Sequence, residues 1–184
     1  RLLVDEGYAA VTSRRVGNEV GLNNALIYYY FGSMDELFIA VYRRRADWML
    51  ECQAKALASP KPLWALWDVT HDQANSALNF EFIALGNHRP AIKAEIVRYS
   101  ERFRRMQLDA LSQGLAGSGL DQELWPTEGV IVLLAAVSRF LVMEDSYGLD
   151  TGHAQAMAIV ERCLHELEGE RPAKRSLELA PDPA

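Results

Sequence analysis

Apolar residues recur three and four positions apart along almost the whole of this 184-residue chain. That spacing places apolar side chains on one face of an α-helix. The strict alternation of polar and apolar residues that marks a half-buried β-strand is nearly absent. The pattern therefore predicts an all-α protein. With 49% hydrophobic residues, the chain can bury one or two cores.

Turn-forming residues divide the chain into eight predicted helices. Gly7, Gly21 and Gly32 can adopt the left-handed backbone that ends a helix, and the segments SPKP (59–62) and SGLDQELWP (118–126) are typical connectors. In the segment SMDE, Ser33 and Glu36 have the spacing of a capping box, which predicts that a long helix begins there. The predicted helices span 1–7, 12–19, 23–30, 34–58, 62–86, 90–116, 126–148 and 152–168.

The helices group into two predicted domains. Residues 1–45 form a small unit of short helices, and residues 46–170 form a larger helical unit. The opening RLLVDEGY is typical of the last two turns of a helix that begins upstream of Arg1. The tail 171–184 has three prolines and few apolar residues, which predicts a disordered segment.

Two short helices in the first domain have the spacing of a helix-turn-helix motif. Helices 12–19 and 23–30 are joined by a short turn that contains Gly21. A small core that sets the angle between them is expected from Val16, Val20, Leu22 and Ile27. The spacing alone fits an ordinary pair of packed helices equally well.

The second of these helices carries side chains suited to a DNA groove. In a helix-turn-helix motif, the N-terminal residues of the second helix face base edges in the major groove. Asn23, Asn24 and Ala25 occupy that end, and asparagine can pair with adenine while alanine can contact a thymine methyl. One turn later, the hydroxyls of Tyr28 and Tyr30 are placed to meet phosphate oxygens.

The preceding helix begins with residues suited to phosphate. Thr12, Ser13 and Arg14 lie where free N–H groups and the positive end of the helix dipole attract an anion. The chain as a whole has a net charge of −6, and residues 1–58 contain as many acidic as basic residues. Any attraction to DNA must therefore come from local groups rather than from an overall basic charge.

The segment Glu6–Val41 resembles the tetracycline-repressor-like (TetR) family of bacterial regulators. The matching motifs are Gly7-Tyr8, Thr12-Ser13, Val16-Gly17, Val20-Gly21-Leu22-Asn23, Tyr28-Tyr29-Tyr30-Phe31 and Ser33-Met34-Asp35-Glu36-Leu37, in the family's order and without a gap. The resemblance covers about a quarter of the chain. It implies an N-terminal three-helix DNA-binding domain, with a truncated first helix here, and a C-terminal domain for ligand binding and dimerisation.

Two positions depart from the family pattern. Gly17 replaces a usual alanine, at a cost of about 1 kcal/mol in helix propensity. Met34 replaces a usual lysine that contacts a DNA phosphate from the start of the fourth helix. The backbone N–H of Met34 can still donate, so we keep Met34 among the predicted DNA-binding residues and expect a weaker, less salt-dependent complex.

The larger domain contains a candidate ligand pocket. A stripe at helical spacing over 62–86 consists of Trp64, Trp67, His71, Asn75, Leu78, Phe82 and Leu85. Polar residues within an aromatic stripe are typical of a ligand cavity, although His71 and Asn75 could also be a hydrogen-bonded pair in the core. The resemblance implies an effector pocket among these helices. The predicted ligand-binding residues are Trp67, His71, Asn75, Phe82, Tyr99 and Phe103.

The last two helices are predicted to form a dimer interface. Residues 130–137 are apolar on nearly every side, and one core covers only about half of such a helix. The resemblance implies that two subunits pair through these helices in a four-helix bundle, whereas a large monomeric core is the alternative. The predicted interface residues are Leu133, Val137, Phe140, Leu141, Met157, Val160 and Leu164.

Other functions find little support in the sequence. The two cysteines, Cys52 and Cys163, lie far apart without metal-ligand spacing, which fits a reducing cytoplasm. The longest apolar stretch, Val130–Met143, is too short and too interrupted to cross a bilayer. We find no glycine-rich phosphate loop and no nucleophile motif. We therefore expect no catalytic residues, no metal and no cofactor.

The sequence thus favours a cytoplasmic, bacterial, homodimeric transcription regulator. We expect a repressor that binds a palindromic double-stranded operator and is released by a small apolar or amphipathic effector. Two alternatives remain at this stage. One is an all-α module that uses its tyrosines for protein contacts, and the other is a small helical enzyme that uses His71 and Glu81.

Overall fold

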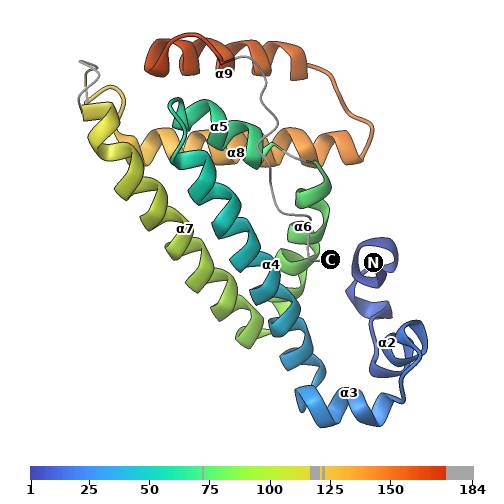
Figure 1. Ribbon diagram of the computed structural model, residues 1–184. Helices are drawn as coiled ribbons and strands as arrows, with labels where there is room; N and C mark the ends of the chain where they lie inside the picture. The colour runs from blue at the N-terminus through green and yellow to red at the C-terminus, as the bar shows by residue number, and fades with distance from the viewer. Residues whose placement is uncertain (72, 117–120, 122, 173–184) are drawn as a thin grey trace. The chain divides into compact units, whose positions relative to one another are not determined.

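The computed structural model consists of α-helices joined by short turns (Figure 1). It describes residues 1–71, 73–116, 121 and 123–172, with only the backbone of 73–76 and 113–116. These residues contain no β-strand, which confirms the predicted all-α fold. The elements are α1 (Leu2–Glu6), η1 (Tyr8–Ala10), α2 (Ser13–Val20), α3 (Asn24–Phe31), α4 (Met34–Leu57), α5 (Pro62–Thr70), α6 (Gln73–His88), α7 (Pro90–Ala116), α8 (Thr127–Ser146) and α9 (His153–Glu168).

Local capping sets the starts of the first helices. The side-chain oxygens of Thr12, Asn23 and Ser33 each accept a hydrogen bond from a backbone N–H in the first turn that follows. These bonds satisfy N–H groups that have no partner within the helix. Gly21, with a φ of 68°, ends α2 in the left-handed conformation that glycine adopts without strain.

The prediction of one helix over 62–86 is wrong, because two helices occupy this segment. α5 ends at Thr70, and α6 begins at Gln73. The carbonyl of Thr70 accepts a hydrogen bond of 2.8 Å from the Ser138 hydroxyl of α8. This contact between helices satisfies a carbonyl that a continuous helix would pair with its own backbone. The predicted stripe from Trp64 to Leu85 therefore does not lie on one helix.

The chain packs into two compact units, and neither is a continuous segment. The first comprises Arg1–Met49 and Ala77–Glu101, and the second comprises Leu50–Ser76 and the described residues from Arg102 onward. Helices α4, α6 and α7 each contribute to both units. These units combine segments that are separated in sequence, whereas the predicted domains 1–45 and 46–170 are continuous. The predicted domains stay a prediction. The predicted disordered tail lies almost entirely outside the described residues.

In the first unit, α4 packs against α6 and α7 and carries the short N-terminal helices. The ring of Tyr42 in α4 makes edge contacts with Phe82 of α6 and Tyr99 of α7, at centroid distances of 5.1 and 5.7 Å. An ion pair joins Asp35, in the first turn of α4, to Arg89. Because α3 is separated from α4 only by Gly32 and Ser33, these contacts also anchor the end of α3.

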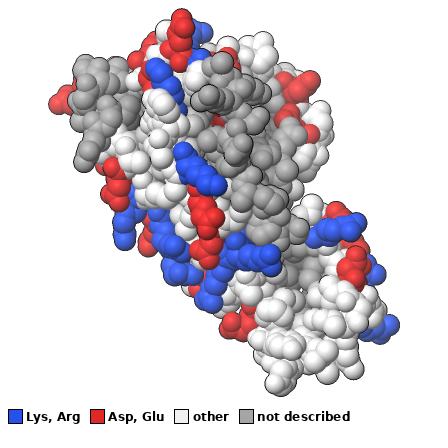
Figure 2. All heavy atoms as spheres, viewed as in Figure 1, with Lys and Arg blue, Asp and Glu red and all other residues white. Residues whose placement is uncertain are grey.

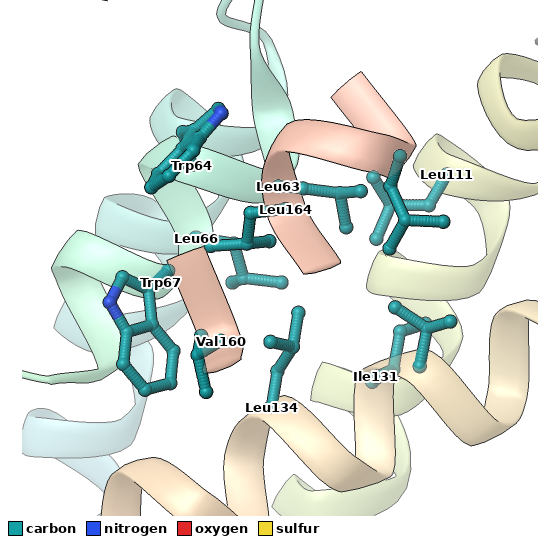
Figure 3. Close-up of a cluster of buried hydrophobic side chains, with 11 residues drawn as sticks. Leu63, Trp64, Leu66, Trp67, Leu111, Ile131, Leu134, Val160 and Leu164 are labelled. Atoms are coloured by element: carbon teal, nitrogen blue, oxygen red, sulfur yellow. The ribbon is translucent and has the colours of Figure 1, made fainter. Parts of the chain in front are cut away.

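In the second unit, α5, α8 and α9 enclose an apolar core to which α7 adds Leu111 (Figure 3). The start of α5 is held by the end of α9, since the carboxylate of Glu168 accepts hydrogen bonds from the N–H groups of Leu63 and Trp64. The buried members of the core are Leu63, Trp64, Leu66, Trp67, Leu111, Val130, Ile131, Leu134, Val160, Leu164 and Leu167.

The expected small core between α2 and α3 is only partly present. Ile27 is buried, but Val20 and Leu22 are 56% and 48% exposed. Val16 and Val20 line an open apolar groove of about 520 Å³ on the α4 side of the unit. The prediction was wrong for Val20 and Leu22 because the two helices approach through backbone at Gly17, which leaves no room for side chains there.

Candidate nucleic-acid interface

Helices α2 and α3 form the corner that the sequence predicts for a helix-turn-helix motif. α2 ends at Val20, and α3 begins at Asn24. The N–H of Leu22 donates a hydrogen bond of 2.8 Å to the carbonyl of Gly17, which ties the turn to α2. The two helices are in direct contact, so the turn presents the start of α3 at a defined position relative to α2.

The outer surface of α3 displays the predicted base-reading and phosphate-binding groups. Asn23, Asn24 and Ala25 are exposed, and the side chains of Tyr28 and Tyr30 are 47% and 71% exposed. Only Ile27 in this helix is fully buried. The helix therefore buries Ile27, leaves Phe31 half-buried and turns its amide and phenol groups outward.

The two asparagines differ in their freedom to read a base. Oδ1 of Asn23 accepts a hydrogen bond of 2.9 Å from the N–H of Ala25, so this side chain caps α3. A bidentate pair with adenine uses the amide oxygen and nitrogen of one asparagine together. Asn24, at the first position of the helix, is exposed beyond that cap. Asn24 is therefore the better candidate for direct base recognition.

The structure adds Tyr29 to the candidate residues. Its side chain is 80% exposed, and its ring lies edge-on to that of Tyr30 with 5.2 Å between centroids. Helical geometry could have identified it, because successive residues turn by about 100°. A residue two positions after the buried Ile27 therefore points away from the core.

The start of α2 places two of its three predicted residues on the surface. Thr12 is exposed, caps α2 and accepts a hydrogen bond from the N–H of Arg15. Arg14 is exposed as well. Ser13 is buried, because it is the first residue of α2 on the side that faces the core, so its hydroxyl is not presented to solvent. Only the backbone N–H of Ser13 fits the predicted phosphate contact.

Positive charge is scarce on this surface. Arg15 is exposed but forms an ion pair with Glu6. At the start of α4, the uncharged Met34 is half-buried, and the Ser33 hydroxyl beside it caps the N–H of Glu36. Figure 2 shows that the surface over α3, at the bottom of the view, carries few charged side chains. Neutral hydrogen-bond donors thus dominate the candidate interface.

The residues predicted to bind a ligand are divided between the two compact units. Phe82 and Tyr99 pack around Tyr42 in the first unit. Trp67, His71 and Phe103 belong to the second unit. The side chain of Asn75 lies outside the described residues. This set of six as a ligand site stays a prediction.

His71 has an unusual environment within the second unit. Its ring stacks on that of Trp67, with 5.0 Å between centroids and planes 12° apart. Its Nδ1 is shielded from solvent and has no hydrogen-bond partner in the described part of the chain. Burial lowers the pKa of His71, and the neighbouring Asp145 and Asp68 oppose that change. The neutral imidazole is therefore favoured at neutral pH.

The predicted dimer residues separate into buried and exposed groups. Leu141, Val160 and Leu164 are buried within the single chain, so they need no partner subunit to cover them. Leu133 and Phe140 are 63% and 54% exposed. Val137 and Met157 are partly buried against the core. The exposed apolar residues of α8 and α9 also include Val132 and Ile159.

Two further features bear on function. None of the helices in the described part of the chain combines the length and the hydrophobicity that a bilayer crossing requires. Likewise, no three His, Cys, Asp or Glu side chains among the described residues are gathered as metal ligands.

The comparisons with known proteins give a family match for the N-terminal residues. Residues 1–41 match the family of bacterial regulatory proteins described as the tetR family. The comparison with curated proteins and that with solved structures found no match to this chain. The matched residues contain both helices of the corner described above and the first turns of α4. The chain thus carries an N-terminal segment that matches the helix-turn-helix DNA-binding domain of tetR-family regulators, and this match supports a DNA-binding transcriptional regulator.

Proposed function

We propose that this protein is a homodimeric repressor that releases its operator when a small molecule binds. The observation that carries the proposal is the exposure of Asn24, Tyr28 and Tyr30 on a helix whose inner face is held by Ile27. The N-terminal end of such a helix can enter the major groove. Asn24 would pair with a base, and the phenols would hold phosphates on either side.

A symmetric dimer would present two such helices. Val132, Leu133, Phe140 and Ile159 are large apolar side chains on α8 and α9 that one chain leaves exposed. Exposed apolar surface of this kind supports pairing with a second copy. The operator would then be a palindrome with half-sites about 34–36 Å apart, or a multiple of that distance. The dimer would act in the bacterial cytoplasm, where its DNA is accessible.

An effector would bind in the larger helical part of the chain. The shielded Nδ1 of His71, stacked against Trp67, is a polar atom whose hydrogen bond a ligand could complete. Trp67 offers an apolar ring, while Asp68 and Asp145 lie near His71, so an amphipathic molecule suits these surroundings. Release would follow if the ligand binds more tightly to a form of the dimer that does not fit the operator.

Selection of duplexes from a random pool tests the DNA-binding role. The full chain should recover a palindromic sequence, and Asn24→Ala should lower affinity for it by about tenfold. Asn87→Ala, which alters an exposed asparagine of α6, is the matched control and should bind as the parent does. Recovery of no preferred sequence, or equal loss in both variants, would contradict the proposal.

A further inference from the structure

The side chains that α3 turns to solvent are all uncharged, and two near its start are apolar. Ala25 is exposed, and Leu26 is 38% exposed. Ala25 lies two positions before the buried Ile27, which places it about 160° from Ile27 around the helix. The methyl group of Ala25 is therefore on the outermost face of α3, one turn before the exposed ring of Tyr29.

Basic residues are missing from a long stretch of sequence around α3. The chain contains no Lys or Arg between Arg15 and Arg43, and α3 itself contains no Asp or Glu. Arg15 forms an ion pair with Glu6, and Arg14 belongs to the phosphate-facing start of α2. The α3 helix therefore offers a base pair no charged side chain, in agreement with the surface in Figure 2.

This set of side chains matches the chemistry of A·T pairs in the major groove. Guanine presents two acceptors that Arg or Lys bonds best, and cytosine presents an amino group that donates to Asp or Glu. Adenine pairs with the amide of asparagine, and only thymine presents a methyl group for an apolar contact. Asn24 and Ala25 supply the amide and the apolar group at neighbouring positions.

The tyrosines of α3 do not provide a comparable discrimination between bases. A phenol hydroxyl both donates and accepts a hydrogen bond, so Tyr28 and Tyr30 can meet any base pair or a phosphate. A methyl contact, in contrast, distinguishes thymine from the three other bases. Discrimination by α3 therefore depends on Asn24 and Ala25.

We propose that the operator half-sites are A·T pairs where α3 enters the major groove, and that Ala25 is a specificity-determining residue that contacts a thymine methyl. The inference rests on the proposed DNA-binding role and deepens it, because it names the base pairs that α3 recognises. Asn24 adds a hydrogen-bonded pair with adenine beside this contact, and Leu26 extends the apolar surface.

The first measurement is the base composition of the half-sites. The full chain selects duplexes from a random pool, and each base pair of the selected sequence is then changed in turn. We expect A·T pairs at the positions where a change lowers affinity most. The selected duplex also provides the DNA for the next measurement.

Replacement of thymine by uracil tests the methyl contact directly, because uracil lacks only the C5 methyl group. One thymine in each half-site is replaced, at each position in turn, and the dissociation constant is measured at one salt concentration. At one position the affinity should fall by about tenfold, since each buried methyl contributes about three- to fourfold and two are lost. Uracil outside the half-sites is the control and should change affinity by less than about twofold.

A variant then assigns the contact to Ala25. Ala25→Gly removes the methyl from the protein, and Ala110→Gly, at an exposed alanine of α7, is the matched control because glycine lowers helix propensity at both positions. A loss of folded protein would weaken binding to the thymine and uracil duplexes equally, so the ratio of their affinities isolates the contact. In Ala25→Gly this ratio should fall to about twofold or less, whereas Ala110→Gly should keep the parent's ratio.

The remaining results would overturn the inference, and they separate it from the proposed function. If G·C pairs carry the preference, or if uracil never changes affinity, the inference is wrong while the DNA-binding role stands. If Ala25→Gly leaves the ratio unchanged, Ala25 does not determine specificity. A parent protein that prefers no duplex would overturn the proposed function itself.

Discussion

The carboxylate of Glu95 in α7 lies 2.8 Å from the guanidinium of Arg43 in α4, and this ion pair joins two helices of the first unit. Arg98 adds a second ion pair to the same carboxylate. These hydrogen bonds, that from Arg43 above all, lower the pKa of Glu95 from 4.5 to about 2. The charged form of Glu95 is thus bound more strongly in the folded chain than in the unfolded chain.

We predict a pH-dependent contribution of Glu95 to stability. Because its pKa is lower in the folded state, the stabilisation is fully present above pH 4.5 and is lost as the pH falls towards 2. Glu95→Gln should lower the free energy of unfolding at pH 7 by about 1 kcal/mol, a small value because both arginines are half exposed. Urea unfolding at several pH values measures this difference.

The control for Glu95 is Glu101→Gln, a change of an exposed carboxylate in the same helix. The difference between parent and Glu95→Gln should shrink at pH 3, since Glu95 is then protonated in the unfolded chain but still mostly charged in the folded chain. A difference that stays constant between pH 7 and pH 3 would contradict the assignment.

Met34→Lys should restore a charged phosphate contact. The half-buried Met34 begins α4, at the position where the TetR pattern has a phosphate-binding lysine. Two added contacts per dimer should make the plot of log K against log salt concentration steeper by about 2. Filter binding at several salt concentrations measures the slope. Ala110→Lys, exposed on α7, should leave the slope unchanged; a similar change in both variants would argue against a local contact.

Removal of the phenol hydroxyls should weaken DNA binding without altering its salt dependence. Tyr28→Phe and Tyr30→Phe each remove one neutral hydrogen-bond donor from the exposed face of α3. We expect each to lower operator affinity by about two- to tenfold. Tyr147→Phe, at a tyrosine that is 73% exposed outside the interface, is the control. Unchanged affinity in both variants would remove the tyrosines from the interface.

Substitutions in α8 and α9 should separate dimer contacts from core contacts. Phe140→Glu places a charge on an exposed apolar side chain and should raise the dimer dissociation constant by about tenfold or more. Leu164→Ala creates a cavity at a fully buried position and should lower the free energy of unfolding by about 3 kcal/mol. Analytical ultracentrifugation and urea unfolding distinguish the two effects.

Two results would contradict the dimer prediction. If Phe140→Glu leaves the association state unchanged while the parent protein is a dimer, the exposed face of α8 is not the interface. If the parent protein is a monomer at micromolar concentration, the proposed palindromic recognition loses its basis.

Local chemistry explains why most helix boundaries could be predicted. The caps at Thr12, Asn23 and Ser33 act on N–H groups within three residues, so their effect is readable in a short segment. Asn24 and Tyr30 lie three positions before and after Ile27, about 60° from it around the helix, so their exposure does not follow from spacing alone. The all-α fold and most helix boundaries followed from such short-range rules.

The incorrect prediction of one helix over 62–86 involves a partner distant in sequence. α5 ends at Thr70, whose carbonyl accepts a hydrogen bond from Ser138, 68 positions later. Leu164, for which an interface role stays a prediction, is covered by the core of its own chain. An apolar periodicity predicts that one face of a helix is buried, but it does not identify the surface that covers this face.

The sequence by itself determined the helical class and most helix ends, since each depends on neighbours a few residues away. Only the tertiary structure decided where α5 stops, which apolar residues remain exposed, and how closely α2 approaches α3. These features depend on contacts between segments, and the distance from Gly17 to the Leu22 carbonyl is set by the packing of two helices rather than by either helix alone.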